Sequence, residues 1–233
     1  MSFETASGDV VDFQAAQAAR QAGTVTDKQA GSRVLKRVLD LCLAVPGLLF
    51  LAPVLFIIAI VVKANDGGPI LFAHTRRGQD GRSFKCLKFR SMAVDAQERL
   101  AALLASDEKL AAEWAARQKL DNDPRVTSVG SFLRKTSLDE LPQLWNIIRG
   151  DMSVVGPRPI VDDEVVRYGE HIEAYDAYRP GIFGLWQISG RSETTYDERV
   201  EMDVNYAKSQ SFLLDLKIIV LGIPAVLLSR GAV

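Results

Sequence analysis

The 233-residue sequence predicts a mainly α-helical protein with a small β-hairpin, built as a monotopic membrane protein. Three observations support this fold class. An uncharged apolar run covers residues 41–62, two strand-like segments flank a turn at residues 78–81, and helical spacing of apolar residues recurs elsewhere. Because 48% of the residues are hydrophobic, the chain can bury a packed core. We therefore expect one domain with extensions.

Composition excludes several classes of function. The net charge is −1, so no broad basic surface indicates nucleic acid, and we expect no nucleic-acid partner. The two histidines, His74 and His171, lie far apart, and we interpret them as surface or packing residues rather than metal ligands. Cys42 and Cys86 lack zinc-type spacing. Two cysteines do not make a disulfide framework, which favours a reducing compartment.

The first 32 residues are rich in Ala, Gln, Ser, Thr and Gly and show no sustained periodicity. This composition predicts a disordered tail. The segment is long and contains several acidic residues, so it resembles neither a signal peptide nor a transit peptide.

The apolar run at residues 41–62 is long enough to cross a bilayer of roughly 30 Å at about 1.5 Å per residue. Pro46 and Pro53 interrupt it, and a proline inside a helix removes a hydrogen bond and kinks the helix. Basic residues flank the run on both sides, namely Arg33, Lys36, Arg37 and Lys63. A straight span would place one basic cluster outside. We favour a re-entrant helix that bends near Pro53 over a spanning helix or a buried core helix.

A β-hairpin is predicted from residues 70–75 and 83–89, because the intervening turn contains Asp80-Gly81. The second strand is basic, with Lys85, Lys88 and Arg90. These charges either protect a solvated strand edge or form a basic wall beside an anionic site. From the residues alone, edge protection is favoured.

Helices are predicted on both sides of the central part of the chain. Residues 93–120 carry an apolar stripe, formed by Leu100, Leu103, Leu104, Leu110 and Trp114. The acidic segment at residues 161–178 is also predicted to be helical. Near the C-terminal end, an apolar piece at residues 218–228 is too short to span a membrane and is broken by Gly222 and Pro224. We expect it to lie at the membrane interface.

Residues 131–160 contain two adjacent carboxylates, Asp139 and Glu140, with cationic residues on both flanks: Arg134, Lys135, Arg149 and Arg158. Ser137 and Glu140 match a capping box, and acidic residues in a first turn complement the helix dipole. A helix capped at Ser137 would place Pro142 in its interior, where the N–H that proline lacks is needed for a hydrogen bond. The helix can instead begin around Pro142. For the acidic pair alone, helix capping is the favoured interpretation.

The same location also suits nucleophilic catalysis. A helix dipole and nearby arginines keep a carboxylate ionised and attract a phosphate. An ionised Asp can attack phosphorus and form an aspartyl-phosphate type of intermediate. Two anions must then approach each other, so guanidinium groups or a divalent cation must offset their repulsion, and the candidates are Arg134, Arg158 and Arg191. The usual nucleotide and hydrolase motifs (Walker A, GxGxxG and GxSxG) are missing.

Several segments spread over residues 33–230 form a specific set: KRVLDL, FKCLKFRSM, LRKTSLDELPQLWNIIRGDMSVVGPRP, RPGIFGLWQISGR and DVNYAKSQSFLLDLKI. Together they resemble the bacterial polyprenyl-phosphate sugar-1-phosphate transferases, the small monotopic phosphoglycosyl transferases. The KLDNDPRVTSVG insert, the LWQISGR loop and the LSRG ending are most similar to the galactose-1-phosphate transferases that initiate exopolysaccharide synthesis.

The resemblance implies an enzyme on the cytoplasmic face of the bacterial inner membrane. It would transfer a hexose-1-phosphate, galactose before glucose, from a UDP-sugar to undecaprenyl phosphate and release UMP through a covalent aspartyl-phosphosugar intermediate. This reaction would be the first membrane step of exopolysaccharide biosynthesis. Membrane lipids would be further partners. The oligomeric state stays open, with a homodimer among the alternatives.

The resemblance also implies roles for individual residues. Asp139 would be the nucleophile, Glu140 its catalytic partner, and magnesium (Mg2+) would bind at Asp139. Substrate phosphates would contact Lys88, Arg134, Arg158 and Arg191. The chain would divide into a disordered tail (1–32), a re-entrant membrane helix (33–66) and a cytoplasmic catalytic domain with interfacial helices (67–233).

One departure from the family concerns the membrane helix. The family's helix usually breaks at Ser-Pro, whereas this chain has Ala52-Pro53. A serine hydroxyl could bond the carbonyl that the proline leaves free, so here the bend depends on Pro53 and its surroundings. Other function classes also stay open: a conventional glycosyltransferase that releases UDP, a membrane-anchored phosphatase, and a non-catalytic scaffold.

Overall fold

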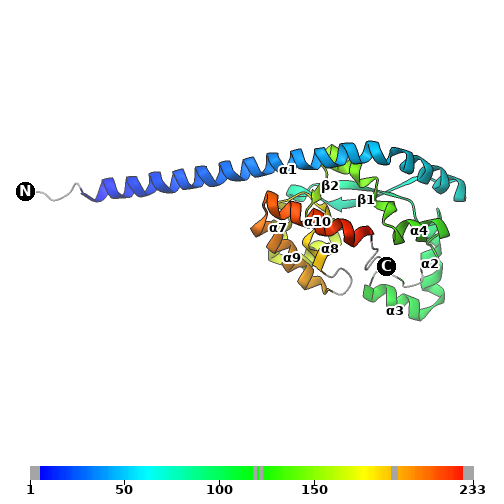
Figure 1. Ribbon diagram of the computed structural model, residues 1–233. Coiled ribbons are helices and arrows are strands. Elements are labelled where there is room, and N and C mark those ends of the chain that lie inside the picture. Colours follow the sequence, from blue (N-terminus) through cyan, green and yellow to red (C-terminus); the bar gives the residue numbers. More distant parts are fainter. Residues whose placement is uncertain (1–5, 118–119, 121–122, 190–193, 228–233) are drawn as a thin grey trace, which may run out of the picture. The chain divides into compact units, whose positions relative to one another are not determined.

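A computed structural model describes residues 6–117, 120, 123–189 and 194–227, and side chains are described from Ser32 onward except at residues 115–119 and beyond 224. Most of these residues are helical, so the predicted mainly α-helical class with a hairpin is confirmed (Figure 1). The helices are α1 (Ala6–Asp66), α2 (Ala96–Ser106), α3 (Glu108–Arg117), α4 (Ser128–Lys135), α5 (Gln143–Arg149), α6 (Val165–Tyr168), α7 (Ile172–Asp176), α8 (Leu185–Ser189), α9 (Tyr196–Ser209) and α10 (Phe212–Leu227).

Helix α1 is continuous through both Pro46 and Pro53, and Figure 1 shows it curving toward its C-terminal end. Its part Ser32–Asp66 is long and apolar enough to cross a membrane, and only 11% of the most apolar window is buried by protein. Large apolar side chains face outward along it, including Phe50 at 84% exposure. This exposure supports contact with lipid. Re-entry into one leaflet stays a prediction.

The tail predicted at residues 1–32 overlaps the start of this helix, because α1 begins at Ala6. Its alanine and glutamine residues are compatible with helical backbone. The division of the chain into tail, membrane helix and catalytic domain stays a prediction.

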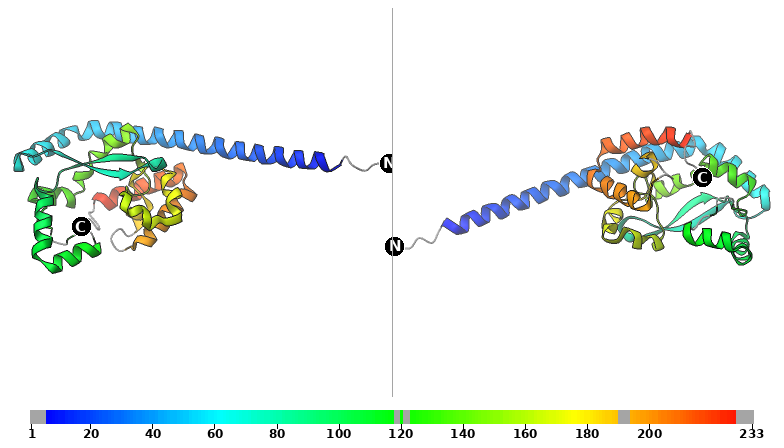
Figure 2. Two further views of the ribbon diagram at one scale, coloured as in Figure 1. Left: turned by 180° about the vertical axis from the view of Figure 1, so that it is seen from behind. Right: turned by 90° about the horizontal axis from the view of Figure 1, so that it is seen from below.

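The hairpin consists of β1 (Leu71–Arg77) and β2 (Ser83–Phe89), which pair in antiparallel fashion. The turn, η1 (Gln79–Gly81), depends on Asp80-Gly81, where both residues have positive φ angles of 57° and 71°. Phe72 lies opposite Lys88, and His74 lies opposite Cys86. The views in Figures 1 and 2 agree that α2 and α3 lie on one side of the hairpin and α7 and α9 on the other.

A second sheet was not predicted from the sequence. It is parallel and joins β3 (Ser153–Val155) to β4 (Gly181–Phe183). A Cβ atom at Gly181 would lie 2.1 Å from the backbone nitrogen of Gly156, so the two strands approach at a distance that requires glycine.

Two apolar clusters hold the domain together. One joins the C-terminal part of α1 to β2 and α4 through Ile58, Val62, Phe89 and Leu133. The other packs α6, α7 and α9 around a set of buried residues: Ile160, Tyr168, Tyr175, Val200 and Val204. Helix α10 is fixed by Asp215, which is fully buried and accepts a hydrogen bond from the Tyr206 hydroxyl at 2.8 Å.

Exposed apolar residues continue beyond α1. They include Phe132 on α4, Trp145 on α5, and Leu213, Val220, Leu221 and Ile223 on α10. Such residues support the predicted interfacial placement of helices, which stays a prediction.

Asp40 connects α1 to β3. Its Oδ1 accepts hydrogen bonds from the Ser153 hydroxyl and the Val154 N–H, both at 2.8 Å, and the residue is 1% exposed. The buried carboxylate therefore fixes the short strand to the membrane-associated helix.

Replacing Asp40 with alanine should destabilise the fold, because the buried Val154 N–H loses its acceptor. An unpaired buried group of this kind costs about 1–3 kcal/mol. We expect a lower unfolding midpoint in detergent for Asp40→Ala. Val166→Ala, at a position 82% exposed, should leave the midpoint unchanged. Equal midpoints for Asp40→Ala and wild type would contradict the assignment.

Candidate active site

The adjacent carboxylates lie on a short 3-10 turn, η2 (Leu138–Glu140), between α4 and α5. Ser137, which precedes it, adopts a left-handed conformation with φ 56°, and its side chain makes no capping hydrogen bond. The predicted capping box at Ser137 is therefore wrong. Helix α5 begins instead at Gln143 with Pro142 at its N-cap, because proline lacks the N–H that an interior helical position needs. The alternative prediction, a helix that begins around Pro142, is therefore confirmed.

Lys88 meets both carboxylates. Its Nζ donates to Glu140 Oε1 at 2.6 Å and lies 3.9 Å from Asp139 Oδ2. The side chain of Asp139 is only 10% exposed, whereas those of Lys88 and Glu140 are 35% and 40% exposed. Lys88 is therefore part of a cluster of opposite charges with Asp139 and Glu140 rather than a charge protecting a strand edge. Asp139 is the inner and Glu140 the outer carboxylate.

Burial raises the pKa of Asp139 to about 6. The positive charges of Lys88 and Arg134 lower this pKa, and the negative charge of Glu140 raises it. The carboxyl group therefore changes its charge close to neutral pH. Perturbed titration of this kind, beside specific charged partners, is typical of functional sites.

The structure brings two of the predicted arginines toward these groups. Arg134 is exposed on the last turn of α4, where its Nε donates to Ser91 Oγ at 2.9 Å and its charge acts on Asp139. Arg158 is exposed beyond β3, and its charge interacts with that of Glu140. Arg191, the third predicted arginine, lies outside the described residues.

Trp186 on α8 supports Arg158, and single-sequence reasoning did not identify it. The Arg158 guanidinium carbon lies 4.9 Å from the Trp186 ring centroid, and that of the buried Arg199 lies 5.6 Å from it. Stacking on an aromatic face orients a guanidinium without neutralising it. A tryptophan in a glycine-rich loop bracketed by arginines was the available signal.

Asn146 on α5 was also missed. It is 1% exposed and hydrogen-bonds the backbone of β2: the Leu87 N–H donates to its Oδ1 at 3.0 Å, and its Nδ2 donates to the Lys85 carbonyl at 2.8 Å. A polar residue within the apolar LWNII run was the only local signal, because its partners lie about 60 residues away.

The Asp139–Glu140 pair suits a magnesium ion that is also bound by substrate, rather than a metal ion bound by protein ligands alone. Among the described residues, no group of three or more His, Cys, Asp or Glu side chains could hold a metal ion. Magnesium commonly binds one or two carboxylates and completes its shell with substrate phosphates and water. Asp139 and Glu140 supply that donor set, although Lys88 now contacts Glu140.

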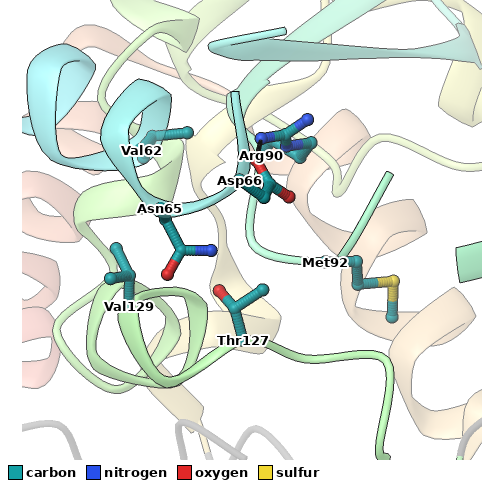
Figure 3. Close-up of a pocket in the computed structure, with 7 residues that line it drawn as sticks. All are labelled: Val62, Asn65, Asp66, Arg90, Met92, Thr127 and Val129. Carbon is teal, nitrogen blue, oxygen red and sulfur yellow. Dashed lines mark hydrogen bonds and ion pairs between the residues drawn. The ribbon is translucent and has the colours of Figure 1, made fainter. Parts of the chain in front are cut away.

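A pocket beside the end of α1 is separate from this cluster. It is lined by Val62, Asn65, Asp66, Arg90, Met92, Thr127 and Val129. Figure 3 shows the Asp66 carboxylate beside the Arg90 guanidinium, with which it forms an ion pair. The adjoining cavity of about 280 Å³ also includes Asp66 but none of Lys88, Asp139 and Glu140. The Asp66–Arg90 pair therefore joins the end of α1 to the residue that directly follows β2.

Comparison with known proteins identifies the family. The model of the bacterial sugar transferases matches residues 31–229. The exopolysaccharide production protein ExoY of Sinorhizobium fredii is 49% identical over 199 residues, which cover 85% of this chain and 88% of that protein. The UDP-galactose-lipid carrier transferase of Erwinia amylovora is 48% identical over 201 residues, or 86% of this chain and 42% of that protein.

The undecaprenyl-phosphate galactose phosphotransferase of Salmonella typhimurium is 47% identical over 201 residues, again 86% of this chain and 42% of that protein. This chain thus spans most of the Sinorhizobium relative but less than half the length of the Erwinia and Salmonella relatives. The resemblance inferred from the sequence motifs is confirmed, and the chain belongs to the bacterial sugar transferase family.

Proposed function

We propose that this protein transfers a hexose-1-phosphate from a UDP-sugar to undecaprenyl phosphate and releases UMP. One observation carries the proposal: a buried carboxylate, Asp139, lies 3.9 Å from the Lys88 ammonium in a chain 47% identical to an undecaprenyl-phosphate galactose phosphotransferase. A phosphoryl-transfer site needs a nucleophile and fixed positive charge, and this pair supplies both.

The reaction proceeds in two displacements at one phosphorus atom. An oxygen of Asp139 attacks the phosphate that carries the sugar, and the bond to UMP breaks, so UMP leaves with the bonding electron pair. An oxygen of undecaprenyl phosphate then attacks the aspartyl-phosphosugar and releases the Asp139 carboxylate. Glu140 assists as a base for the lipid phosphate or by holding Lys88, with which it makes its 2.6 Å contact.

Both substrates are anions, so the site must offset their charge. Lys88 and Arg134 act beside Asp139, Arg158 extends the positive charge toward Glu140, and we assign Arg191 the same role from its sequence motif. Magnesium, held by Asp139 and Glu140 together with the donor diphosphate, would neutralise charge that develops on the phosphate oxygens.

The membrane helix explains how a water-soluble donor and a lipid acceptor meet. We propose that residues 33–66 of α1 re-enter the membrane with a bend near Pro53, leaving the catalytic domain on the cytoplasmic face of the inner membrane. The outward apolar residues of α1 support contact with lipid. The exposed Phe132, Trp145 and Leu213 suit helices that lie in the membrane interface.

The transferred sugar is proposed as galactose, because two of the relatives are named for galactose transfer. Glucose is the alternative. The released nucleotide separates this function from that of a conventional glycosyltransferase, which would release UDP. A phosphatase would need no lipid acceptor.

Replacing Asp139 with asparagine should reduce UMP release by at least about 1000-fold, because the amide cannot act as the nucleophile. The variant should unfold at a midpoint no lower than that of the wild type, since burial penalises the charged carboxylate that the amide replaces. Purified protein in nanodiscs with undecaprenyl phosphate and UDP-galactose provides the assay. Glu170→Gln, at an exposed carboxylate, is the matched control. Substantial UMP release by Asp139→Asn would refute the nucleophile assignment.

The pH dependence should report the ionisation of Asp139. Its pKa is raised to about 6, so a growing fraction is protonated and inactive as the pH falls through that value, and kcat/KM for the donor should fall with it. Lys88 lowers this pKa, so Lys88→Met should move the acidic limb to higher pH. Because a dication at Asp139 favours the carboxylate, both profiles are measured at one magnesium concentration. An acidic limb that does not shift would contradict the electrostatic account.

Re-entry can be tested by labelling cysteines at either end of the membrane helix. In a Cys42→Ser background, Ser32→Cys and Asn65→Cys should both react with an impermeant maleimide in inside-out vesicles and be protected in spheroplasts. Asn205→Cys, exposed on α9, is the cytoplasmic control. Labelling of one end from the outer side would indicate a spanning helix.

A further inference from the structure

Strand β2, which carries Lys88, is hydrogen-bonded on one edge by strand β1 and on its other edge by the side chain of Asn146. The amide of Asn146 accepts from the Leu87 N–H at 3.0 Å and donates to the Lys85 carbonyl at 2.8 Å. The Lys85 carbonyl and the Leu87 N–H flank Cys86, and they are the two groups that one residue of an adjacent parallel strand would engage. Asn146 thus substitutes for a third strand immediately before Lys88.

Asn146 itself is held rigidly. Its Nδ2 also donates to Asp151 Oδ2 at 3.2 Å, so both amide hydrogens are used. Its backbone carbonyl accepts from the N–H groups of Gly150, Asp151 and Met152 at 3.1, 3.0 and 3.3 Å. The side chain is almost fully buried at 1% exposure. A buried polar group with all its hydrogen bonds satisfied has one favoured orientation.

Short covalent paths connect this amide to both sides of the charged cluster. Lys88 directly follows Leu87 on β2, and Glu140 lies just before α5, which begins at Gln143 and contains Asn146. The Lys88 Nζ contacts at 2.6 Å to Glu140 and 3.9 Å to Asp139 therefore depend on how β2 lies against α5. A two-stranded hairpin is only marginally stable, so the extra pairing is needed to fix that placement.

We infer that Asn146 is a positioning residue for the transfer reaction: its amide sets the placement of Lys88 relative to Asp139 and Glu140. The inference rests on the proposed function, because it concerns the geometry of that same site. Asn146 touches no substrate and acts through Lys88. A displacement of about 1 Å in a catalytic group can reduce a rate about 100-fold, so a modest loosening of β2 is sufficient for a large effect.

The test is a double-mutant cycle between Asn146 and Lys88. Asn146→Leu keeps the number and branching of side-chain heavy atoms and removes both hydrogen bonds to β2, and it should lower kcat about 100-fold with a much smaller change in the donor KM. In a Lys88→Met background, the same substitution should lower kcat by less than about threefold, because the group it positions is already lost. Asn146→Ala removes the same hydrogen bonds without a bulkier side chain and should have a similar effect on kcat.

Tyr206→Phe is the matched control, because it also removes a buried hydrogen bond, from the tyrosine hydroxyl to Asp215 at 2.8 Å. It should lower the unfolding midpoint but leave kcat within about threefold of wild type. If Asn146→Leu does not fold, Asn146→Ala is carried through the same cycle.

Two results would overturn the inference. One is an equal loss of kcat from the Asn146 variant with and without Lys88, which would indicate a general structural role. The other is wild-type kcat in a folded Asn146→Leu protein. Failure of the proposed function is a separate outcome: release of UDP instead of UMP would refute that function and leave the coupling between Asn146 and Lys88 measurable.

Discussion

A carboxylate buried in protein must be matched by positive charge, and this requirement governs the site around Asp139. Burial alone would keep the group protonated and unreactive. Lys88 and Arg134 oppose that effect, so its pKa is raised to about 6 rather than far above neutrality. The site thus keeps the Asp139 carboxylate partly desolvated and still ionisable near pH 7, which suits the proposed attack on a phosphate that is itself anionic.

The β1–β2 hairpin satisfies this requirement because both strands bind the segments that carry charge. On β1, the Arg77 N–H donates to the Ile160 carbonyl at 2.8 Å, which fixes the loop that presents Arg158. On β2, the Asn146 amide fixes the strand that presents Lys88. The parallel pairing of β3 with β4 then connects that loop to the segment that leads to Trp186. A small sheet structure thereby organises charges from distant parts of the sequence.

The same domain is joined to the apolar helix at two levels. Asp40 bonds β3, and Ile58 and Val62 pack against Phe89 on the Lys88 strand and Leu133 on the Arg134 helix. The helix that carries the exposed apolar residues therefore shares one apolar core with the elements that carry Lys88 and Arg134. In the proposed reaction this arrangement keeps the nucleophile at the depth where a lipid phosphate and a soluble nucleotide sugar can both reach it.

Much of the fold followed from local signals. Asp80-Gly81 predicted the hairpin turn, apolar spacing predicted the helices, and Pro142 indicated the true start of α5. The capping box at Ser137 failed because Pro142 excludes the helix frame it needs. The three-residue strands β3 and β4 are too short to give a periodic signal, and their pairing depends on a close approach at Gly181.

The site was predictable only in part. Asp139 and Glu140 were identifiable as an adjacent acidic pair, but their residues alone favoured capping, and Lys88 alone favoured edge protection. Both interpretations are decided by tertiary contacts: Lys88 Nζ lies 2.6 Å from Glu140 Oε1 and 3.9 Å from Asp139 Oδ2. The partners of Asn146 lie about 60 residues away, so its role could not be found from its neighbours in the sequence.

The central claim is that the phosphosugar passes through a covalent bond to Asp139. Mass spectrometry of the enzyme after incubation with UDP-galactose and magnesium, without lipid acceptor, tests it directly. Trypsin cleavage after Lys135 and Arg149 isolates residues 136–149, which contain the acidic pair. The account predicts that this peptide gains the mass of one hexose phosphate at Asp139 and loses it when undecaprenyl phosphate is added. No adduct under turnover-competent conditions, or an adduct on another residue, would contradict the account.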